Sequence, residues 1–265
     1  MATIAVTGSA SGIGAATARR LRGAGRHVIG IDLRDADVTA DLSSPDGRAH
    51  AIDSVLAECG GTLDGLVTCA GIAGSSTEGG ARLVSINYFG TVELAKGLRP
   101  ALAQGTDAAV VCVSSNSTTC QPNWPTAISD ACLAGDETAA RAAADAQISL
   151  FAYPASKAAV AWWVRENAPT ADWIGAGIRL NAIAPGVVET PMVAGQRADP
   201  MIGPHIDAFP VPRGRNGTPE EAAAIIDFLL GPDSRLLCGS IVFADGGTDA
   251  SLRARDLPAR WSLNE

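Results

Sequence analysis

The sequence predicts an α/β fold, a doubly wound parallel sheet (Rossmann fold) of about seven strands with helices on both faces. Three observations indicate this fold. Short apolar runs alternate with amphipathic or alanine-rich stretches along nearly the whole chain. The runs are apolar at consecutive positions, as in strands that are buried on both faces of a sheet. A glycine-rich loop joins the first run to the first helical stretch, where such sheets bind dinucleotides.

The candidate elements follow one another from the amino end. Strands are expected at Thr3–Thr7, His27–Ile31, Val38–Ala40, Gly65–Cys69, Ala108–Val113, Gly177–Ile183 and Ser240–Ala244. Helices are expected at Ile13–Ala24, Asp46–Glu58, Val84–Leu102, Asp136–Ile148 and Tyr153–Asn167. Another helix should begin after Thr218, because this N-cap hydroxyl is followed by a proline and, three residues on, by Glu221. No repeat or linker divides the chain, so a single domain over residues 1–265 is predicted, with a polar tail at 250–265.

The composition argues against several classes of protein. The 20 basic residues are outnumbered by 28 acidic ones, and the net charge of −8 is unlike that of a nucleic-acid-binding domain. No apolar run approaches the ~20 residues that cross a bilayer, and no signal peptide is recognised, so we expect a cytoplasmic protein without a membrane partner. The six cysteines form no close pair and none of the three histidines is near them, so no metal site is predicted.

The loop after the first strand reads Thr-Gly-Ser-Ala-Ser-Gly-Ile-Gly from position 7 to 14. A dinucleotide pyrophosphate needs a tight turn, close approach of the backbone and the N-terminus of a helix. Gly8, Gly12 and Gly14 supply the first two, and the helix that opens at Ile13, with Ser11 before it, supplies the third. The loop is therefore predicted to bind the pyrophosphate of a dinucleotide.

An acidic residue closes the second strand at Asp32. A carboxylate at this place accepts hydrogen bonds from the adenine ribose hydroxyls and repels a 2′-phosphate, so NAD is the predicted cofactor rather than NADP. Arg34 lies two residues further on and could attract a 2′-phosphate.

The chain has two tyrosines and two lysines, and one of each stands in Tyr153-Pro-Ala-Ser-Lys157. A spacing of four places both side chains on one face of a helix. A tyrosine with its usual pKa near ~10 is a poor base at neutral pH, and a neighbouring ammonium could lower that value by about 1–3 units. We therefore expect Tyr153 to be the general acid/base of a hydride-transfer reaction, with Lys157 lowering its pKa and binding the cofactor ribose.

The glycine loop, Asp32 and the Tyr153/Lys157 pair together resemble the short-chain dehydrogenase/reductase family, over residues 3 to about 249. The resemblance implies that Ser115 hydrogen-bonds the substrate oxygen, and that Asn87 kinks a helix and holds a water linked to the lysine. It also implies cofactor contacts near the adenine, beside the nicotinamide and at its carboxamide. These residues are Leu33, Asp41, Leu42, Cys69, Ala70, Gly71, Pro185, Gly186, Val188 and Thr190.

Two features depart from the usual pattern of the family. Cys69 stands where the family has an asparagine, which puts a structural hydrogen bond in doubt. Tyr153 follows Ser115 by far more residues than usual, so a helical insertion is predicted at about 117–150. Such an insertion should cover the outer face of the catalytic helix, where many members form tetramers, so we expect a homodimer, with a homotetramer as the alternative. Trp162 and Trp163 cannot both face the sheet, so one should be core and the other should meet the insertion or a partner subunit.

With both departures, the sequence resembles family members that oxidise 3α-hydroxysteroids and reduce carbonyl compounds. The segment Pro191–Arg215 is rich in apolar residues, prolines and glycines, and is predicted to be a lid over an apolar alcohol or ketone. Two other hypotheses remain open. The enzyme could act on a terpene, polyol or sugar alcohol, or the chain could bind NAD without turnover.

Overall fold

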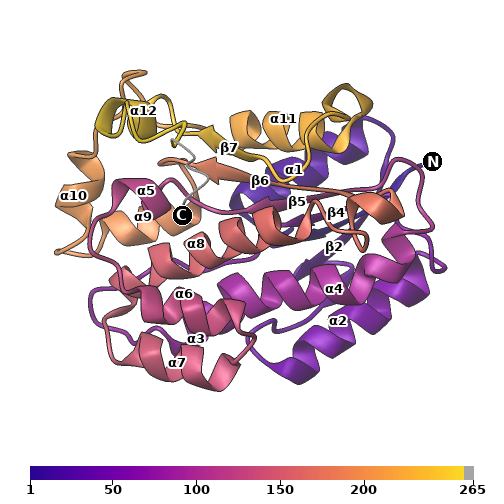
Figure 1. The fold of residues 1–265 in the computed structure, drawn as a ribbon, viewed down its shortest axis with the longest axis horizontal. Helices are drawn as coiled ribbons and strands as arrows, with labels where there is room; N and C mark the ends of the chain where they lie inside the picture. Colours follow the sequence, from indigo (N-terminus) through magenta and orange to yellow (C-terminus); the bar gives the residue numbers. More distant parts are fainter. Residues whose placement is uncertain (260–265) are drawn as a thin grey trace, which may run out of the picture.

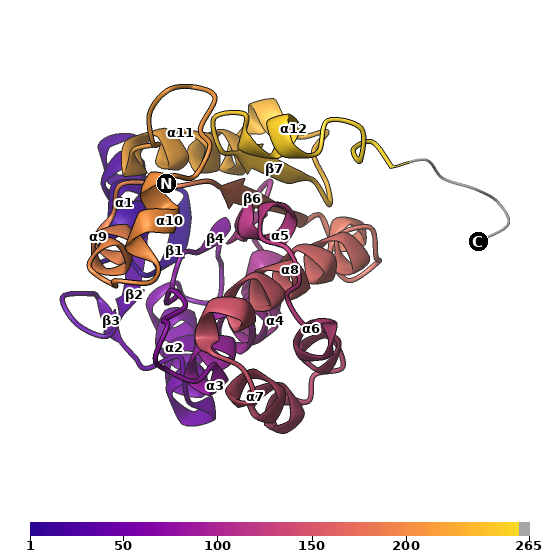
Figure 2. The same ribbon diagram turned by 90° about the vertical axis from the view of Figure 1, so that its left-hand side faces the viewer.

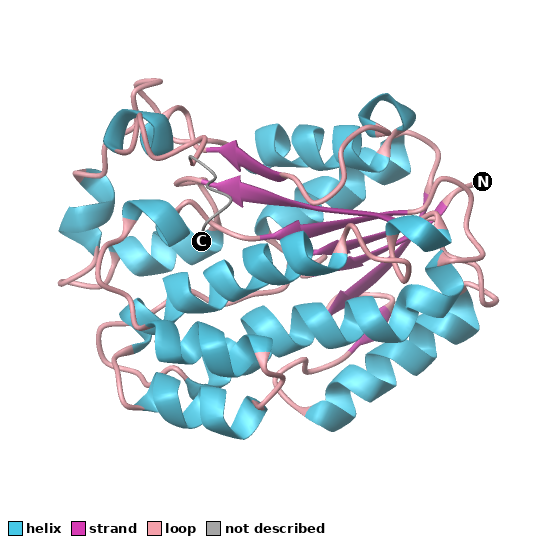
Figure 3. Ribbon diagram, in the orientation of Figure 1, coloured by secondary structure: helices cyan, strands magenta, loops and turns pink. Residues whose placement is uncertain are grey.

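The structure is a computed structural model, and it describes residues 1–259. Its centre is a seven-stranded parallel sheet in the order β3-β2-β1-β4-β5-β6-β7 (Figures 1 and 3). The strands are β1 (Thr3–Thr7), β2 (His27–Asp32), β3 (Val38–Thr39), β4 (Gly65–Thr68), β5 (Ala109–Val113), β6 (Arg179–Pro185) and β7 (Ile241–Ala244). The order reverses between β1 and β4, where the two halves of a doubly wound sheet diverge. The predicted fold class is confirmed.

Helices cover both faces of this sheet. On one face lie α1 (Gly12–Gly23) and α11 (Pro219–Leu230), which pack against each other; α2 (Pro45–Glu58), α4 (Gly90–Leu102) and α8 (Ser149–Asn167) lie on the other (Figure 1). Outside this second layer lie α3 (Ala81–Val84), α6 (Thr126–Leu133) and α7 (Glu137–Asp145). The carboxyl edge carries α5 (Ser117–Cys120), α9 (Pro191–Arg197), α10 (Gly203–Asp207) and α12 (Thr248–Leu252), and Figure 2 looks onto it. Short 3₁₀ turns occupy Ile174–Ala176 and Pro232–Ser234.

The predicted helix at Val84–Leu102 is interrupted. A π-helical turn, Ser85–Phe89, lies between α3 and α4, and all five of its residues are buried. Such a turn inserts a residue into the helical ladder and is frequent at functional sites. The prediction of one regular helix was therefore wrong at its first turns, and the kink implied by the family resemblance lies at this place.

The catalytic-helix candidate begins earlier than predicted. It starts at Ser149 rather than Tyr153, so Pro154 lies inside the helix. A proline there has no N–H for the carbonyl four residues back, which is that of Leu150. The side chain of Gln121 donates to this carbonyl instead, with a distance of 3.0 Å from Nε2 to the oxygen. The inserted segment thus supplies the hydrogen bond that allows the helix to run through its proline.

The sixth strand begins two residues later than predicted, at Arg179, because Gly177 adopts a left-handed conformation (φ 79°) that ends the preceding turn. The Arg179 side chain is buried and donates to the backbone carbonyls at the end of α11. Its guanidinium nitrogens lie 2.9 Å from the carbonyl oxygen of Leu229, 3.2 Å from that of Gly231 and 2.9 Å from Oγ of Ser234. A β-strand arginine therefore serves as the cap of a helix C-terminus, where positive charge is stabilising.

The insertion contains more helix than predicted. Beside α7, which Asp136 caps through a 2.9 Å bond to the Ala139 N–H, it forms α5 and α6. Trp163 is buried and meets Trp173 edge-on, with ring centres 5.5 Å apart. Trp162 is 39% exposed and packs on Trp124 of the insertion at 5.8 Å. One tryptophan is core and the other meets the insertion, as predicted.

No helix in residues 1–259 is long and apolar enough to cross a membrane. Of the predicted polar tail, the first residues form the end of α12, and residues 260–265 lie outside the described part of the chain.

Candidate active site

A cavity of about 720 Å³ lies at the carboxyl edge of the sheet. It runs from the loops after β1 and β2, past the ends of β4, β5 and β6, to the α9–α10 segment. All the residues that were predicted to contact the cofactor line it. So do three of the four predicted catalytic residues, Ser115, Tyr153 and Lys157, while Asn87 lies behind the wall and is fully buried.

The glycine loop takes the shape that its sequence predicted. Gly8 and Gly12 have positive φ angles of 67° and 52°, which residues with side chains rarely adopt. A Cβ on Gly14 would lie 2.1 Å from the carbonyl oxygen of Gly8, so α1 can approach the strand only with glycine here. Ser11 precedes α1 without making a side-chain cap, and the first N–H groups of the helix are left for another acceptor. The loop therefore fits a pyrophosphate.

Asp32, at the end of β2, is half-buried on the cavity wall. One of its carboxylate oxygens accepts the N–H of Ala10 at 2.9 Å and the other accepts the N–H of Leu33 at 2.7 Å. Each oxygen keeps a lone pair for a ligand hydroxyl. Arg34 is exposed and is not among the residues that line the cavity.

The wall beyond Asp32 is formed by Asp41 and Leu42. The carboxylate of Asp41 accepts the N–H of Ser43 at 2.9 Å, and this hydrogen bond lowers its pKa below the usual value. Arg82 of α3 lines the same end of the cavity, and its positive charge acts in the same direction. Arg82 was not predicted from the sequence, because it lies in no recognisable motif.

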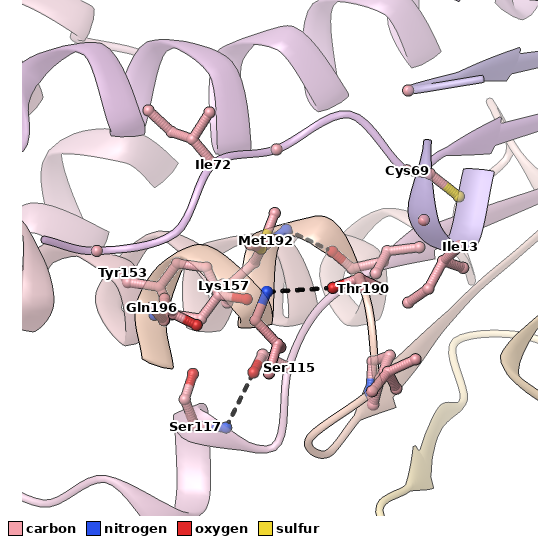
Figure 4. Close-up of a pocket in the computed structure, with 18 of the residues that line it drawn as sticks. Ile13, Cys69, Ile72, Ser115, Ser117, Tyr153, Lys157, Thr190, Met192 and Gln196 are labelled. Atoms are coloured by element: carbon pink, nitrogen blue, oxygen red, sulfur yellow. Dashed lines mark hydrogen bonds between the residues drawn. The ribbon is translucent and has the colours of Figure 1, made fainter. Parts of the chain in front are cut away.

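The tyrosine and the lysine share one face of α8 (Figure 4). Burial raises the pKa of Tyr153, and the hydrogen bond with Ser115 opposes this effect. The expectation that Lys157 lowers the tyrosine pKa is not met in the free protein. Lys157 Nζ lies 5.9 Å from the centre of the tyrosine ring and donates to the carbonyl of Val113 at 2.9 Å, while burial lowers the lysine's own pKa to about 8.

The two serines after β5 have different surroundings. Ser114 is buried, and its hydroxyl donates to the backbone carbonyl of Lys157 at 2.8 Å. The hydroxyl of Ser115 accepts the N–H of Ser117 at 3.1 Å (Figure 4). A hydroxyl that accepts from the backbone can point its own proton into the cavity. The geometry therefore favours Ser115 over Ser114 as the residue that meets a ligand.

Asn87 stands in the π-helical turn. Its side chain closes two hydrogen bonds with the backbone of Ile72, accepting the N–H at 2.9 Å and donating to the carbonyl at 3.1 Å. A Cβ on Gly71 would lie 3.0 Å from the Asn87 oxygen and 3.5 Å from Lys157 Nζ. Asn87 thus holds the segment after β4 beside the lysine.

The next part of the wall carries Cys69, Gly186 and Thr190. Burial raises the pKa of the Cys69 thiol to about 12, so it remains protonated and unreactive at neutral pH. Cys69 stands where the family has an asparagine. Beside it, the Ala70 N–H donates a hydrogen bond to the Thr7 hydroxyl at 2.9 Å. A Cβ on Gly186 would lie 2.9 Å from Asp245, and Thr190 caps α9 by accepting the Val193 N–H at 3.3 Å.

The predicted lid forms α9 and α10 and closes the far end of the cavity. Five of its large apolar side chains line the cavity: Met192, Val193, Ile202, Ile206 and Phe209. Met201 and Val211 do not, and Met201 is 56% exposed. Ion pairs brace the lid, because Arg197 binds both carboxylate oxygens of Glu189 and also Asp207 at 2.8 Å.

A hydrogen bond joins the lid to the opposite wall. Ser76, on the loop after β4, donates to the Asp199 carboxylate at 2.6 Å. Polar residues that the sequence gave no reason to select also line this half: Gln121 from the insertion and Gln196 and His205 from the lid. They belong to no motif, and only the folding of the two segments brings them to the cavity.

Comparisons with known proteins agree with this site. A family model described as short chain dehydrogenase matches residues 2–127, and one described as enoyl-(acyl carrier protein) reductase matches residues 137–249. The chain is 43% identical to a 3-alpha-hydroxysteroid dehydrogenase/carbonyl reductase of Comamonas testosteroni, over 96% of this chain and 98% of that protein. It is 34% identical to a cis-4-hydroxycyclohexanecarboxylate dehydrogenase of Sinomonas cyclohexanicum, over 92% and 95%.

A solved structure has nearly the same fold. The 3-alpha-hydroxysteroid dehydrogenase from Pseudomonas sp. B-0831, complexed with NADH, is matched with a TM-score of 0.92 and 47% identity, over 96% of this chain and 99% of that one. The resemblance stated from the sequence is confirmed: the chain belongs to the short-chain dehydrogenase/reductase family, the members of which are oxidoreductases that act on CH–OH groups.

Proposed function

We propose that the protein is an NAD-dependent oxidoreductase that interconverts a secondary alcohol and a ketone, with Tyr153 as its general acid/base. One observation carries the proposal. A single continuous cavity joins a dinucleotide cradle at Gly8–Gly14 to the side chains of Ser115, Tyr153 and Lys157. A protein that only bound a dinucleotide would not need a proton donor at the far end of that cradle.

NAD is the cofactor that this cavity favours. Asp32 offers two carboxylate oxygens to ribose hydroxyls, and the same charge would repel a 2′-phosphate. The exposed Arg34 does not line the cavity, which weakens the case for NADP. The similar Pseudomonas enzyme was solved with NADH. When bound, NAD supplies a nicotinamide ring that accepts or donates a hydride.

The side chains of the cavity would each have a separate role in proton transfer or in binding. In reduction, the Tyr153 hydroxyl gives its proton to the substrate oxygen, and in oxidation the tyrosinate removes the alcohol proton. Ser115, oriented by the Ser117 N–H, donates a hydrogen bond to the same oxygen. Lys157 keeps two N–H donors beyond its bond to Val113 for the ribose hydroxyls. Asn87 holds the backbone beside the lysine.

The proposed substrate is a 3α-hydroxysteroid or another apolar alcohol or ketone. The lid lines its half of the cavity with the apolar side chains of Met192, Ile202 and Phe209. The hydroxyls of a sugar would be unpaired against these apolar side chains, which weakens binding, and Gln121, Gln196 and His205 of the insertion and lid could pair with only some of them. The Comamonas relative is a hydroxysteroid dehydrogenase and carbonyl reductase, which supports the same choice.

The test compares kcat/KM for androsterone and for galactitol at saturating NAD. The rates are measured from the absorbance of the NADH that forms. We expect androsterone to be preferred by at least about a hundredfold, because burial of an apolar skeleton is worth several kcal/mol. A preference for galactitol would favour the polyol alternative, since galactitol dehydrogenases are among the relatives at 30% identity. Binding of NADH without turnover of any alcohol or ketone would favour the non-catalytic alternative.

We also propose that the protein is a homodimer. The insertion covers part of the outward face of α8, where Trp162 packs on Trp124. A tetramer that used this face would have to displace the insertion. Light scattering that shows a stable tetramer would contradict the proposal.

A further inference from the structure

The mechanism does not use the buried charge of Arg48. The side chain of Arg48, in the first turn of α2, is 1% exposed. It binds the Glu93 carboxylate of α4, with 2.5 Å between its Nε and the nearer oxygen, and the Glu137 carboxylate of α7, with 2.5 Å from Nη2. A guanidinium buried between two carboxylates is fully paired and is held in one orientation. Three helices are thereby joined at one point.

The third partner of Arg48 belongs to the cavity wall. Nη1 donates to the backbone carbonyl of Leu42 at 3.2 Å. Leu42 and Asp41 line the end of the cavity beyond Asp32, where the adenosine half of the proposed cofactor would bind. The start of α2 packs directly beneath them, since a Cβ on Gly47 would lie only 2.0 Å from the Asp41 carbonyl oxygen. A shift of Arg48 would therefore move this wall.

Glu137 is the partner that comes from the insertion. It is the first residue of α7, and its side chain is 21% exposed, so its hold on Arg48 depends on where α7 packs. Without it, the guanidinium would keep Glu93 but lose its hydrogen bonds on the other side. Buried charges that lose a partner rearrange or admit water.

We propose that Glu137 is a positioning residue for the cofactor. Through Arg48 it fixes the Asp41–Leu42 wall, so that the inserted segment contributes to binding of the adenosine half of NAD. This inference rests on the proposed function. It gives the insertion a role at the cofactor end of the cavity. The wall concerned, Asp41–Leu42, is distant in sequence from the catalytic helix that the insertion precedes.

The test compares Glu137→Ala with Asp136→Ala. Asp136 caps the same helix by accepting the Ala139 N–H and has no ion pair with Arg48, so its replacement removes the cap but neither carboxylate partner of Arg48. For Glu137→Ala we expect Kd for NADH and for ADP-ribose to rise about tenfold, a size typical of residues that orient a binding group. We expect kcat at saturating NADH to change less than twofold, and kcat/KM with NMNH, which lacks adenosine, to stay unchanged. Glu137→Gln keeps hydrogen bonding and should show a smaller rise in Kd.

Three results would overturn the inference. These are an unchanged Kd for NADH in Glu137→Ala, an equal loss with NMNH, or an equal rise in Kd in Asp136→Ala. If Glu137→Ala does not fold, the comparison is made with Glu137→Gln, for which an unchanged Kd has the same meaning. If the wild type binds neither NADH nor ADP-ribose, the proposed function itself fails, and this outcome is recognised before any variant is made.

Discussion

The two halves of the cavity are built in different ways. The cofactor half is made of backbone at the ends of buried strands, with Gly8 and Gly14 packed so closely that no side chain would fit. The substrate half is covered by α9 and α10, which are braced by the half-exposed Arg197 and linked to the opposite wall through Ser76 and Asp199. The first half is therefore a preformed site, whereas exposed ion pairs of this kind contribute little and leave the second half free to open.

This difference separates what each half does. A preformed wall binds a cofactor with little ordering cost, and a segment held by few polar contacts can admit and release substrate. The proposed proton chemistry lies at the border between the two halves, where Tyr153 and Lys157 come from the helix α8. Changes in the rigid half should therefore alter cofactor binding or the chemical step, and changes in the lid should alter substrate binding.

Replacing the tyrosine at the border should have the largest effect. Tyr153→Phe keeps the partly buried ring in place and removes only the proton donor. General acid/base catalysis contributes roughly 10²–10⁴-fold, so kcat should fall by that factor while Kd for NADH is unchanged. Steady-state rates and fluorescence titration of NADH measure both. Activity above a tenth of that of the wild type would remove Tyr153 from the role.

Variants of Ser114 and Ser115 test which of the two serines acts on the substrate. Ser115→Ala should lower kcat by about 10²-fold, because it removes a donor aimed at the substrate oxygen. Ser114→Ala should instead lower thermal stability, because it removes the hydrogen bond that the Ser114 hydroxyl donates to the Lys157 carbonyl. The two variants serve as each other's control. If Ser114→Ala loses more activity than Ser115→Ala, the roles have been assigned the wrong way round.

The buried Lys157 should lower the free energy of unfolding of the protein. Burial lowers its folded-state pKa to about 8, against an unfolded value near 10.4. The native protein therefore disfavours the charged form, and this destabilisation, roughly 3 kcal/mol, is present below pH 8 and disappears as the pH rises through the unfolded pKa. Lys157→Met should be inactive but more stable than the cofactor-free wild type at pH 7.

Denaturant unfolding at several pH values measures this difference. The gap in the free energy of unfolding between Lys157→Met and the wild type should narrow from pH 8 to pH 10. Comparing the two proteins cancels the titration of their other groups. A gap that stays constant with pH would mean that Lys157 titrates normally in the folded protein.

Cofactor choice tests the preformed half. The wild type should prefer NAD over NADP by at least about tenfold in kcat/KM, because charged hydrogen bonds contribute about 1.5–3 kcal/mol and the carboxylate repels a 2′-phosphate. Asp32→Ala should reduce that preference to about twofold or less. Equal rates with both cofactors in the wild type would mean that Arg34 outweighs Asp32.

The lid contact should give the smallest effect. Ser76→Ala removes one partly buried hydrogen bond to Asp199, worth about 0.5–1.5 kcal/mol. KM for the ketone should rise two- to tenfold or so, with Kd for NADH unchanged. Thr77→Ala is the control, because Thr77 bonds Ser75 on the same loop and does not touch the lid. Equal effects of the two variants would mean that the loop as a whole, and not this contact, matters.

The same contrast explains what the sequence could predict. The glycine loop, Asp32 and the Tyr153/Lys157 pair were found because their chemistry requires particular residue types at short, fixed spacings. The seven strands were found because strands buried on both faces are continuously apolar. Their bounds differ from the predicted ones by at most two residues, as at β6, where Gly177 ends the preceding turn.

Other features depend on contacts between distant segments and have no local signature. The early start of α8 depends on Gln121, which lies 29 residues before Leu150. Arg82 and His205 reach the cavity only because α3 and the lid fold onto it. The raised pKa of Tyr153 follows from burial, which the residue spacing did not reveal.

The arginine of β6 has a consequence for how the chain is made. Arg179 leaves the ribosome about 50 residues before Leu229, Gly231 and Ser234, the residues that satisfy its donors. Until they arrive, the guanidinium must stay in water, because burying it unpaired would be too costly. The edge of the sheet at β6 and β7 therefore cannot close before these residues have been synthesised. The wall at Gly186 packs on Asp245, which follows β7, so this part of the cavity can form only after Asp245 has been synthesised.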